Sequence, residues 1–261
     1  MILVFGGTTE GKQVVSVLAD MGYRFWYSSK TEISIDLPPN GQYRYGAFTT
    51  ETLTDFCRQQ AIGLIIHASH PFATELHRTI EEAASRTGIP VVRPEREYPA
   101  PVEHPLIHYT PGYPELLQAL EDERFWQQAF PPEPVLALTG VQTIARLQPY
   151  WRQRRMLFRI LPRDSSLAIA RGTGFPEKDL LLSFPADTVD EEFALIRSTG
   201  AQAILTKESG ESGFLSVKIT AAIAAGIPLF IVCRPPLPPG FIKVHGPAAL
   251  IREIKKIPAW T

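Results

Sequence analysis

Apolar and polar positions alternate in blocks along the chain, with short apolar runs followed by longer segments of helical spacing. The first block is the clearest, because residues 1–5 are wholly apolar and residues 12–21 repeat apolar side chains every three or four positions. Residues 6–11, which include three glycines and two threonines, separate them. This pattern predicts a buried strand, a tight turn and a helix.

The same alternation continues to the end of the chain and predicts an α/β fold with parallel sheets. Strands are expected at residues 1–5, 23–28, 43–47, 62–68, 91–92, 135–138, 156–161, 203–206, 229–233 and 241–244. Helices are expected at residues 12–21, 50–60, 74–87, 113–125, 141–147, 165–170, 190–198, 217–226 and 247–256. A proline-rich break at residues 131–134 predicts two Rossmann-like domains, residues 1–130 and 135–261, with a cleft between them.

The turn at residues 6–11 is the leading candidate for a dinucleotide site. Gly6 and Gly11 match the first and last glycines of the dinucleotide fingerprint, whereas Thr8 stands at the position of the second. Backbone N–H groups and the positive end of the following helix favour a pyrophosphate there. The alternative is a plain strand-to-helix turn with Thr9 as N-cap. The candidate cofactor-binding residues of this turn are Gly6, Gly7, Thr8, Thr9, Glu10 and Gly11.

The end of the second predicted strand bears on the choice of nicotinamide. In a dinucleotide fold, an acid at this position binds the ribose diol of NAD, whereas hydroxyls and a cation bind the extra phosphate of NADP. This chain has Ser28, Ser29 and Lys30 there. They favour NADPH. Glu32 weakens this inference, Lys30 can also be a solvated loop charge, and NADH stays open.

Two polar residues follow the strand expected at residues 62–68. Ser69 and His70 should point into the same crevice as the glycine turn, with Pro71 opening the next helix. A histidine there can donate a hydrogen bond or transfer a proton near neutral pH. Capping the helix is the equally weighted alternative.

Basic and hydroxyl side chains follow the other predicted strands as well. Arg93 and Arg96 suit substrate carboxylates, although internal pairs with Glu95 or Glu97 are as plausible. The second half of the chain repeats the strand, turn and helix pattern of the first residues in shorter form. Its candidate substrate-binding residues are Thr139, Gly140, Lys207, Ser209, Gly210, Lys218 and Arg234.

Composition narrows the classes of partner and compartment. The 261 residues include 44% hydrophobic residues and have a formal charge of -1, so a globally basic surface and nucleic-acid binding are disfavoured. Cys57 and Cys233 lie far apart without metal-like spacing and suggest reduced thiols. We expect a cytoplasmic protein with no metal site, signal peptide or membrane span. A monomer is compatible with the sequence, which does not fix the oligomeric state.

The order and spacing of these motifs resemble those of precorrin-6A reductases, including the cobalt-precorrin-6A reductases of the anaerobic cobalamin pathway. The resemblance covers nearly the whole chain and depends on the set rather than on one motif. It is carried by residues 6–11, residues 68–73, Thr139 and Gly140, residues 207–210 with Gly213 and Lys218, and residues 227–235. The chain departs from the family at His67, where an acid is usual, and at Ser69, where threonine is usual.

The resemblance implies an oxidoreductase of cobalamin biosynthesis. The expected reaction reduces a ring D double bond of (cobalt-)precorrin-6A to give (cobalt-)precorrin-6B, with hydride from NAD(P)H and a proton added to the neighbouring carbon. His70 or a bound water would supply the proton, and His67 would replace the family acid or point into the core. The macrocycle carries many carboxylates, which need local cations in a near-neutral protein.

Two alternatives remain at this point. Paired βαβ arrays also occur in non-catalytic proteins that bind nucleotides or small molecules between two domains. A short-chain-type dehydrogenase for another substrate is disfavoured, because no Tyr-x-x-x-Lys pair follows a mid-chain strand.

Overall fold

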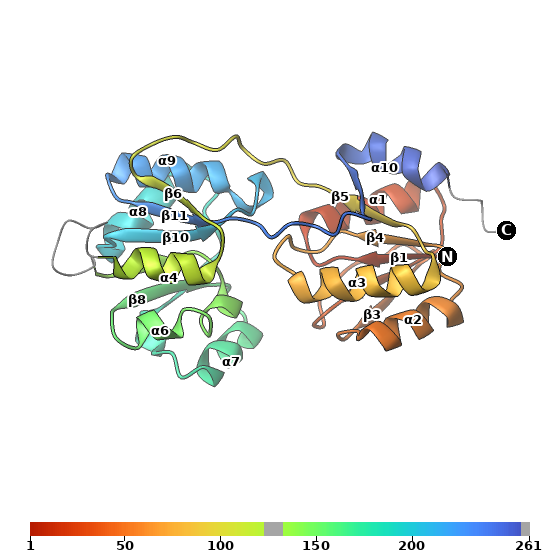
Figure 1. The fold of residues 1–261 in the computed structure, drawn as a ribbon, viewed down its shortest axis with the longest axis horizontal. Coiled ribbons are helices and arrows are strands. Elements are labelled where there is room, and N and C mark those ends of the chain that lie inside the picture. The colour runs from red at the N-terminus through yellow and green to blue at the C-terminus, as the bar shows by residue number, and fades with distance from the viewer. Residues whose placement is uncertain (123–132, 257–261) are drawn as a thin grey trace. The chain divides into compact units, whose positions relative to one another are not determined.

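The computed structural model describes residues 1–122 and 133–256, and it divides the chain into two compact units (Figure 1). Unit 1 comprises Met1–Glu97 and Pro235–Thr261, and unit 2 comprises Tyr98–Arg234. The described residues of each unit form one parallel six-stranded sheet with helices packed on it. The predicted α/β fold class, with Rossmann-like parallel sheets, is confirmed.

The sheet of unit 1 has the strand order β12-β5-β4-β1-β2-β3. Its strands are β1 (Ile2–Phe5), β2 (Phe25–Ser29), β3 (Gly41–Tyr45), β4 (Leu64–His67), β5 (Val91–Pro94) and β12 (Ile242–Val244). Its helices are α1 (Thr9–Asp20), α2 (Thr50–Gln59), α3 (Thr74–Thr87) and α10 (Gly246–Lys255). Helices α1 and α10 lie on one face of the sheet, and α2 and α3 lie on the other (Figure 1).

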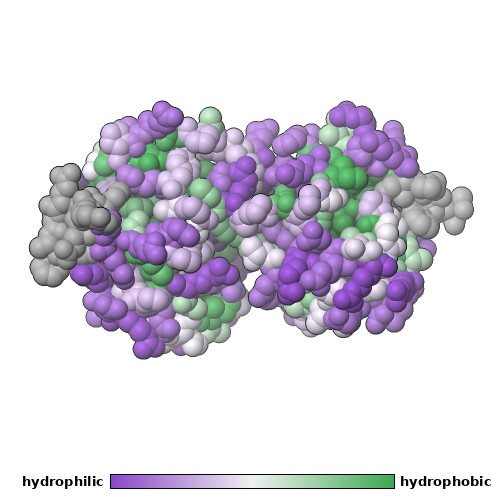
Figure 2. Space-filling model, in the orientation of Figure 1, coloured by the Kyte–Doolittle hydropathy of each residue, from purple (hydrophilic) through white to green (hydrophobic). Residues whose placement is uncertain are grey.

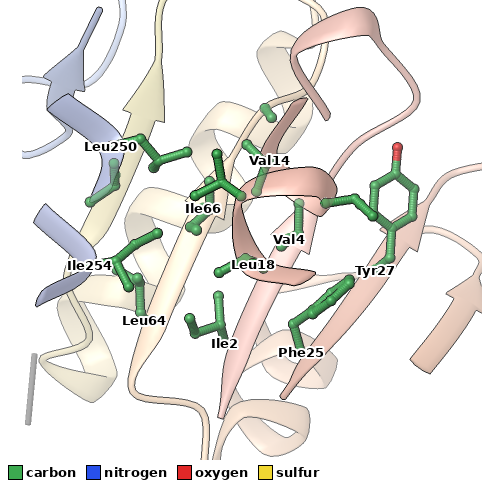
Figure 3. Close-up of a cluster of buried hydrophobic side chains, with 14 of the residues drawn as sticks. Ile2, Val4, Val14, Leu18, Phe25, Tyr27, Leu64, Ile66, Leu250 and Ile254 are labelled. Carbon is green, nitrogen blue, oxygen red and sulfur yellow. The ribbon is translucent and has the colours of Figure 1, made fainter. Parts of the chain in front are cut away.

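Two cores hold this unit together, one on each face of the sheet. Alternate residues of β1 serve the two faces, because side chains along a strand point to opposite sides. Ile2 and Val4 pack with α1 and α10, as the labelled side chains of Figure 3 show. Leu3 and Phe5 pack with α2 and α3. Burial on both faces explains why β1 is an uninterrupted apolar run.

The sheet of unit 2 repeats this arrangement in the order β6-β11-β10-β7-β8-β9. Its strands are β6 (Ile107–Thr110), β7 (Val135–Ala137), β8 (Met156–Ile160), β9 (Leu180–Leu182), β10 (Ala203–Lys207) and β11 (Leu229–Val232). Its α-helices are α4 (Tyr113–Glu121), α6 (Gln148–Trp151), α7 (Asp164–Gly172), α8 (Val189–Thr199) and α9 (Leu215–Ala225). Short 3₁₀ turns cover Val141–Thr143, Glu177–Asp179 and Glu211–Gly213.

Each sheet receives its sixth strand from a distant part of the chain. Strand β6 pairs with β11, and β12, which follows unit 2 in the sequence, pairs with β5. The division of the structure therefore falls after Glu97 and after Arg234, not at residues 131–134 as the sequence prediction had it. Part of that proline-rich break, residues 131–132, lies outside the described residues.

Local differences from the predicted elements concentrate after β7. The helix expected at residues 141–147 is a 3₁₀ turn, Val141–Thr143, followed by the four-residue helix α6. The Thr143 hydroxyl donates to the Gly140 carbonyl, and such side-chain bonds compete with a regular helix. Strands β6 and β9 were not predicted. The helix expected at residues 113–125 is described as far as Glu121.

The visible faces of both units are mainly hydrophilic, with apolar residues in small patches (Figure 2). The described helices include none that is both long and apolar enough to span a bilayer. The described residues also contain no group of three or more His, Cys, Asp and Glu side chains placed to hold a metal ion.

Candidate functional site

Both sheets have a switch point where the strand order reverses, between β1 and β4 in unit 1 and between β7 and β10 in unit 2. Ligands of open α/β sheets bind beyond the carboxyl ends of the strands at such points. Most of the candidate residues follow these strands directly, and the rest follow a neighbouring strand or lie on helix α9.

The glycine turn of unit 1 closes tightly over β2. The Gly6 N–H donates to the Ser28 carbonyl at 3.0 Å, and a Cβ on Gly6 would stand 2.1 Å from the Tyr27 ring. Gly7 has φ +93° and donates its N–H to the Tyr27 hydroxyl at 2.7 Å. No atom lies within 4 Å of the place where a Cβ would stand on Gly7. The turn therefore needs glycine at Gly6 for packing, and its outer side at Gly7 is open.

Thr8 joins the two loops of this switch point. It is the N-cap of α1, since its hydroxyl accepts from the Gly11 N–H at 3.1 Å. The same hydroxyl donates to the Ala68 carbonyl after β4 at 2.6 Å. The alternative that named Thr9 as N-cap was wrong by one residue. Within the described residues, the backbone N–H groups of Thr8 and Thr9 have no hydrogen-bond acceptor, as expected at a helix start that can bind an anion.

Arg96 pairs with an acid of this turn. Its guanidinium lies 3.1 Å from the Glu10 carboxylate in the first turn of α1, and both side chains are buried. A lone carboxylate at this helix end would repel a phosphate, and the arginine offsets its charge. Glu10, a residue distant in sequence, is thus an internal partner of Arg96.

Arg93 holds the loop that follows β4. Its Nη1 donates to the carbonyls of His67 and Ser69, each at 2.8 Å, and its Nε donates to Glu95 at 3.0 Å. The side chain is only 1% exposed. Arg93 therefore forms the internal pair with Glu95 that the sequence left as an alternative.

A buried chain of hydrogen bonds ends at Ser69. His77 of α3 donates from Nε2 to the Pro71 carbonyl at 2.8 Å, because that oxygen can only accept. His77 Nδ1 then accepts from His67 Nε2 at 2.7 Å. His67 Nδ1 in turn accepts from the Ser69 hydroxyl at 3.3 Å. The Ser69 proton points inward, and its lone pairs remain for a donor.

Burial determines the charge state of this chain. His67 is fully buried, and burial together with the positive charge of Arg93 holds its pKa well below the ordinary 6.5. Burial also lowers the pKa of His77, against a smaller opposing effect of the bond to Pro71. Both rings are therefore neutral at neutral pH. His67 was expected either to replace the family acid or to point into the core, and the structure shows it in the core.

His70 is partly exposed in the same loop. Its Nδ1 accepts from the Phe72 N–H at 3.2 Å. Helix α3 begins at Thr74, with Ala73 as N-cap and no side-chain cap, so Pro71 precedes the helix instead of opening it. His70 orders the approach to the helix without capping it.

The end of β2 contains a contact that sequence reasoning missed. Ser28 and Ser29 are buried, whereas Lys30 is exposed. The Ser29 hydroxyl bonds to Tyr43 and to the Thr31 carbonyl. The Ser28 hydroxyl accepts from Arg44 of β3 at 2.8 Å. Parallel pairing of Ser28 with Arg44 brings this cation to the strand end, and the register of two strands was not readable from the sequence.

The switch point of unit 2 begins with a closed turn after β7. Thr139 is 1% exposed, and its hydroxyl lies 2.6 Å from that of Thr143. Since Thr143 donates to the Gly140 carbonyl, Thr139 is the donor of the pair. Gly140 has φ +81°. The Thr139 side chain thus stabilises the turn from inside.

Cations gather around β10 and α9. Lys218 is buried and donates to the Gly213 carbonyl. Burial, with the charges of Arg159 and Lys207 nearby, lowers the Lys218 pKa to about 8. Arg159 forms a buried pair with Glu192, in which its Nη1 donates to both carboxylate oxygens, each at 2.9 Å. The loop that follows Lys207 contains Ser209 and Gly210, and Ser209 is buried.

Arg234 follows β11 and is held from two sides. Its guanidinium pairs with Glu208 and lies 3.7 Å from the centre of the Tyr98 ring. The Glu208 carboxylate also accepts from the Arg234 backbone N–H at 2.9 Å. A pair of this kind orders the loop after β10.

Comparison with known proteins identifies the family. The family model described as precorrin-6x reductase CbiJ/CobK matches residues 1–257. The chain belongs to this family. It is 32% identical over 256 residues to the precorrin-6A reductase of Rhodococcus erythropolis, covering 96% of this chain and 95% of the relative. It is 28% identical to the cobalt-precorrin-6A reductase of Priestia megaterium, covering 93% of each.

A solved structure supports the fold of the CbiJ/CobK family member. The structure titled CobK precorrin-6A reductase aligns over 98% of this chain and 96% of its own, with a TM-score of 0.77 and 22% sequence identity. The family predicted from the sequence is confirmed. The expected class, an oxidoreductase of cobalamin biosynthesis that uses a nicotinamide cofactor, is confirmed as well. The alternative of a non-catalytic binding protein is not favoured.

Proposed function

We propose that this CbiJ/CobK family member reduces a ring D double bond of (cobalt-)precorrin-6A to give (cobalt-)precorrin-6B, with NADPH as hydride donor. The observation that carries the proposal is the glycine turn at the β1–β4 switch point of a chain whose relatives are named reductases of this substrate. A corrin precursor is the expected partner, and the cytoplasm is the expected compartment.

The residues of unit 1 fit a dinucleotide. Gly7 leaves its outer side open, the N–H groups of Thr8 and Thr9 lie at the positive end of α1, and Arg96 offsets the charge of Glu10. The nicotinamide supplies the hydride when it is bound. Around it, the protein's residues would bind the pyrophosphate and orient the ring. We assign the pyrophosphate to residues 6–11 and the adenosine end to residues 28–30.

The residues of unit 2 fit an anionic macrocycle. Lys207 and Lys218 lie at or beside the end of β10, and Ser209 and Gly210 follow in the same loop. Carboxylates bind well to ammonium groups that are partly removed from water. We therefore assign substrate contacts to this loop.

Two side chains of unit 1, Ser69 and His70, are considered as the source of the proton. Ser69 is disfavoured, because its hydroxyl donates inward to His67 and reversal would require a charged His67 in a buried site. His70 is partly exposed and next to it, so His70 or a water that it holds is the proposed donor. Ser69 would instead accept a hydrogen bond from a ligand.

The test measures cofactor binding and reduction together. Purified protein is mixed with NADPH and the macrocycle, and NADPH oxidation should be stoichiometric with the change in the macrocycle's absorbance. Gly7→Asp places bulk and negative charge at the open side of the turn, so NADPH affinity measured by calorimetry should collapse. Retained affinity would move the site away from the turn. Binding without oxidation would favour the non-catalytic alternative.

A further inference from the structure

Arg44 stands at the adenosine end of the proposed cofactor site and has no role in the assignments above. It lies on β3, directly opposite Ser28 of β2 in the parallel register. Since the residues at the end of β2 read the ribose of a dinucleotide in this fold, Arg44 is placed at the edge where a 2′-phosphate would enter.

The guanidinium of Arg44 is held in one orientation by the protein. Its Nη1 donates to the Ser28 hydroxyl at 2.8 Å and to the Gly46 carbonyl at 3.1 Å. Its Nη2 donates to the Tyr45 carbonyl at 3.1 Å. The central carbon lies 3.7 Å from the centre of the Phe48 ring. Three of the five N–H donors are used, so one on Nη2 and the one on Nε remain.

The charge of Arg44 is not neutralised by a carboxylate among the described residues. Within the described part of the chain, its acceptors are a hydroxyl and two backbone carbonyls, all without formal charge. Two acids of the helices on this face of the sheet have other partners, because Glu51 of α2 pairs with Arg86 of α3 at 3.3 Å and Glu82 of α3 accepts from Thr50 at 2.6 Å. Partial burial lowers the Arg44 pKa, as expected of a cation without a counter-ion.

This combination is unusual for a structural arginine. The other half-buried or buried arginines described above, Arg93, Arg96, Arg159 and Arg234, all pair with a glutamate. A fixed, stacked guanidinium with two remaining donors and an unmatched charge suits a phosphate dianion, which accepts paired N–H groups from arginine.

We propose that Arg44 is the residue that distinguishes NADPH from NADH, by binding the 2′-phosphate of the adenosine ribose. Ser28 is then a positioning residue, since it is 2% exposed and its hydroxyl holds Arg44. The assignment rests on the proposed function for the presence of a nicotinamide cofactor in unit 1. It adds the chemical group that is recognised and the side chain that recognises it.

The experiment compares two nucleotides that differ only in the 2′-phosphate. Calorimetry measures the binding of 2′,5′-ADP and 5′-AMP to the wild type, Arg44→Gln and Arg44→Lys. Arg58→Gln is the control, since Arg58 is an exposed arginine of the same unit at the far end of α2. The wild type and the control should bind 2′,5′-ADP more tightly than 5′-AMP. Arg44→Gln should weaken 2′,5′-ADP by about 10- to 100-fold and leave 5′-AMP nearly unchanged.

Steady-state rates provide a second measurement with its own folding control. In Arg44→Gln the KM for NADPH should rise by a similar factor while turnover with NADH is retained, which shows that the variant is folded. Arg44→Lys keeps the charge without the planar fork and should lie between the two. Equal losses for both nucleotides, or unchanged binding of 2′,5′-ADP, would overturn the assignment.

Failure of the inference and failure of the proposed function give different results. If the macrocycle is reduced and Arg44→Gln binds 2′,5′-ADP like the wild type, the reaction stands and Arg44 is not the phosphate site. If 2′,5′-ADP binding depends on Arg44 but no nicotinamide is oxidised, the phosphate site stands and the proposed reaction falls.

Discussion

The buried histidine chain of unit 1 makes a prediction about acid stability. His67→Gln removes a titratable ring from the core and can keep its hydrogen bonds, because a glutamine amide can accept from Ser69 and donate to His77. The variant therefore separates the ionisation of His67 from its packing. The wild type should lose more stability on acidification than the variant does.

The sign follows from the two states of the chain. The pKa of His67 is well below the ordinary 6.5 in the folded protein, so the ring stays neutral there as the pH falls. In the unfolded chain it takes up a proton below pH 6.5, and this uptake favours unfolding. The stability contributed by the neutral ring is complete above 6.5 and is lost as the pH falls from 6.5 towards the folded-state pKa. Between about pH 7.5 and about pH 5, proton uptake by the unfolded chain sets an upper limit of about 2 kcal/mol for one such histidine.

Urea unfolding followed by circular dichroism measures this difference. The free energy of unfolding is determined for both proteins across that pH window at constant ionic strength. Other groups, among them His77 and the Arg93–Glu95 pair that faces the chain from β5, are present in both proteins and largely cancel. His245→Gln alters an exposed histidine of the same unit and should keep the wild-type pH dependence. Parallel pH profiles for the wild type and His67→Gln would refute the reasoning.

Three other predictions concern the switch points and the core of unit 2. Lys207→Ala should raise the KM for the macrocycle more than the KM for the nicotinamide, and steady-state kinetics with the reverse result would assign that loop to the cofactor. His70→Ala should remove one limb of the pH–rate profile, and an unchanged profile would exclude acid–base work by this residue. Glu192→Gln should lower the free energy of unfolding by about 3–5 kcal/mol, because it leaves a buried arginine unpaired. Glu177→Gln, in an exposed pair, should leave the urea midpoint nearly unchanged.

Much of the fold could be predicted because its signals are local. Central strands such as β1 and β4 are buried on both faces and appear as short apolar runs. Helix α3 was predicted with both of its ends, since Gly88 adopts the left-handed conformation that ends it. The pattern of such elements was enough for a parallel α/β fold and for the candidate turns at the strand ends.

What the sequence could not show depends on contacts between distant segments. Nothing in the spacing of Ile107–Thr110 or Ile242–Val244 indicates which sheet each strand joins, so the boundary was placed at a proline-rich break instead. Position at a strand end also does not tell whether a side chain turns inward. Arg93 and Thr139 stand at the expected edges, and both are buried against their own loops. Arg44 was missed because its importance depends on the register between β2 and β3.

The two switch points share a topology and differ in the groups that follow their strands. In unit 1 the turn leads into α1, a 12-residue helix, and a Cβ on Gly7 of this turn would meet no atom within 4 Å. In unit 2 the corresponding turn leads into a three-residue 3₁₀ turn whose hydroxyls, Thr139 and Thr143, bond to one another and to the turn. A helix start of that length offers little dipole to a pyrophosphate. The cations of unit 2 come instead from side chains at β10 and α9, Lys207 and Lys218, which suit carboxylates at several positions. This difference supports the proposed assignment of a dinucleotide to unit 1 and of a polycarboxylate to unit 2.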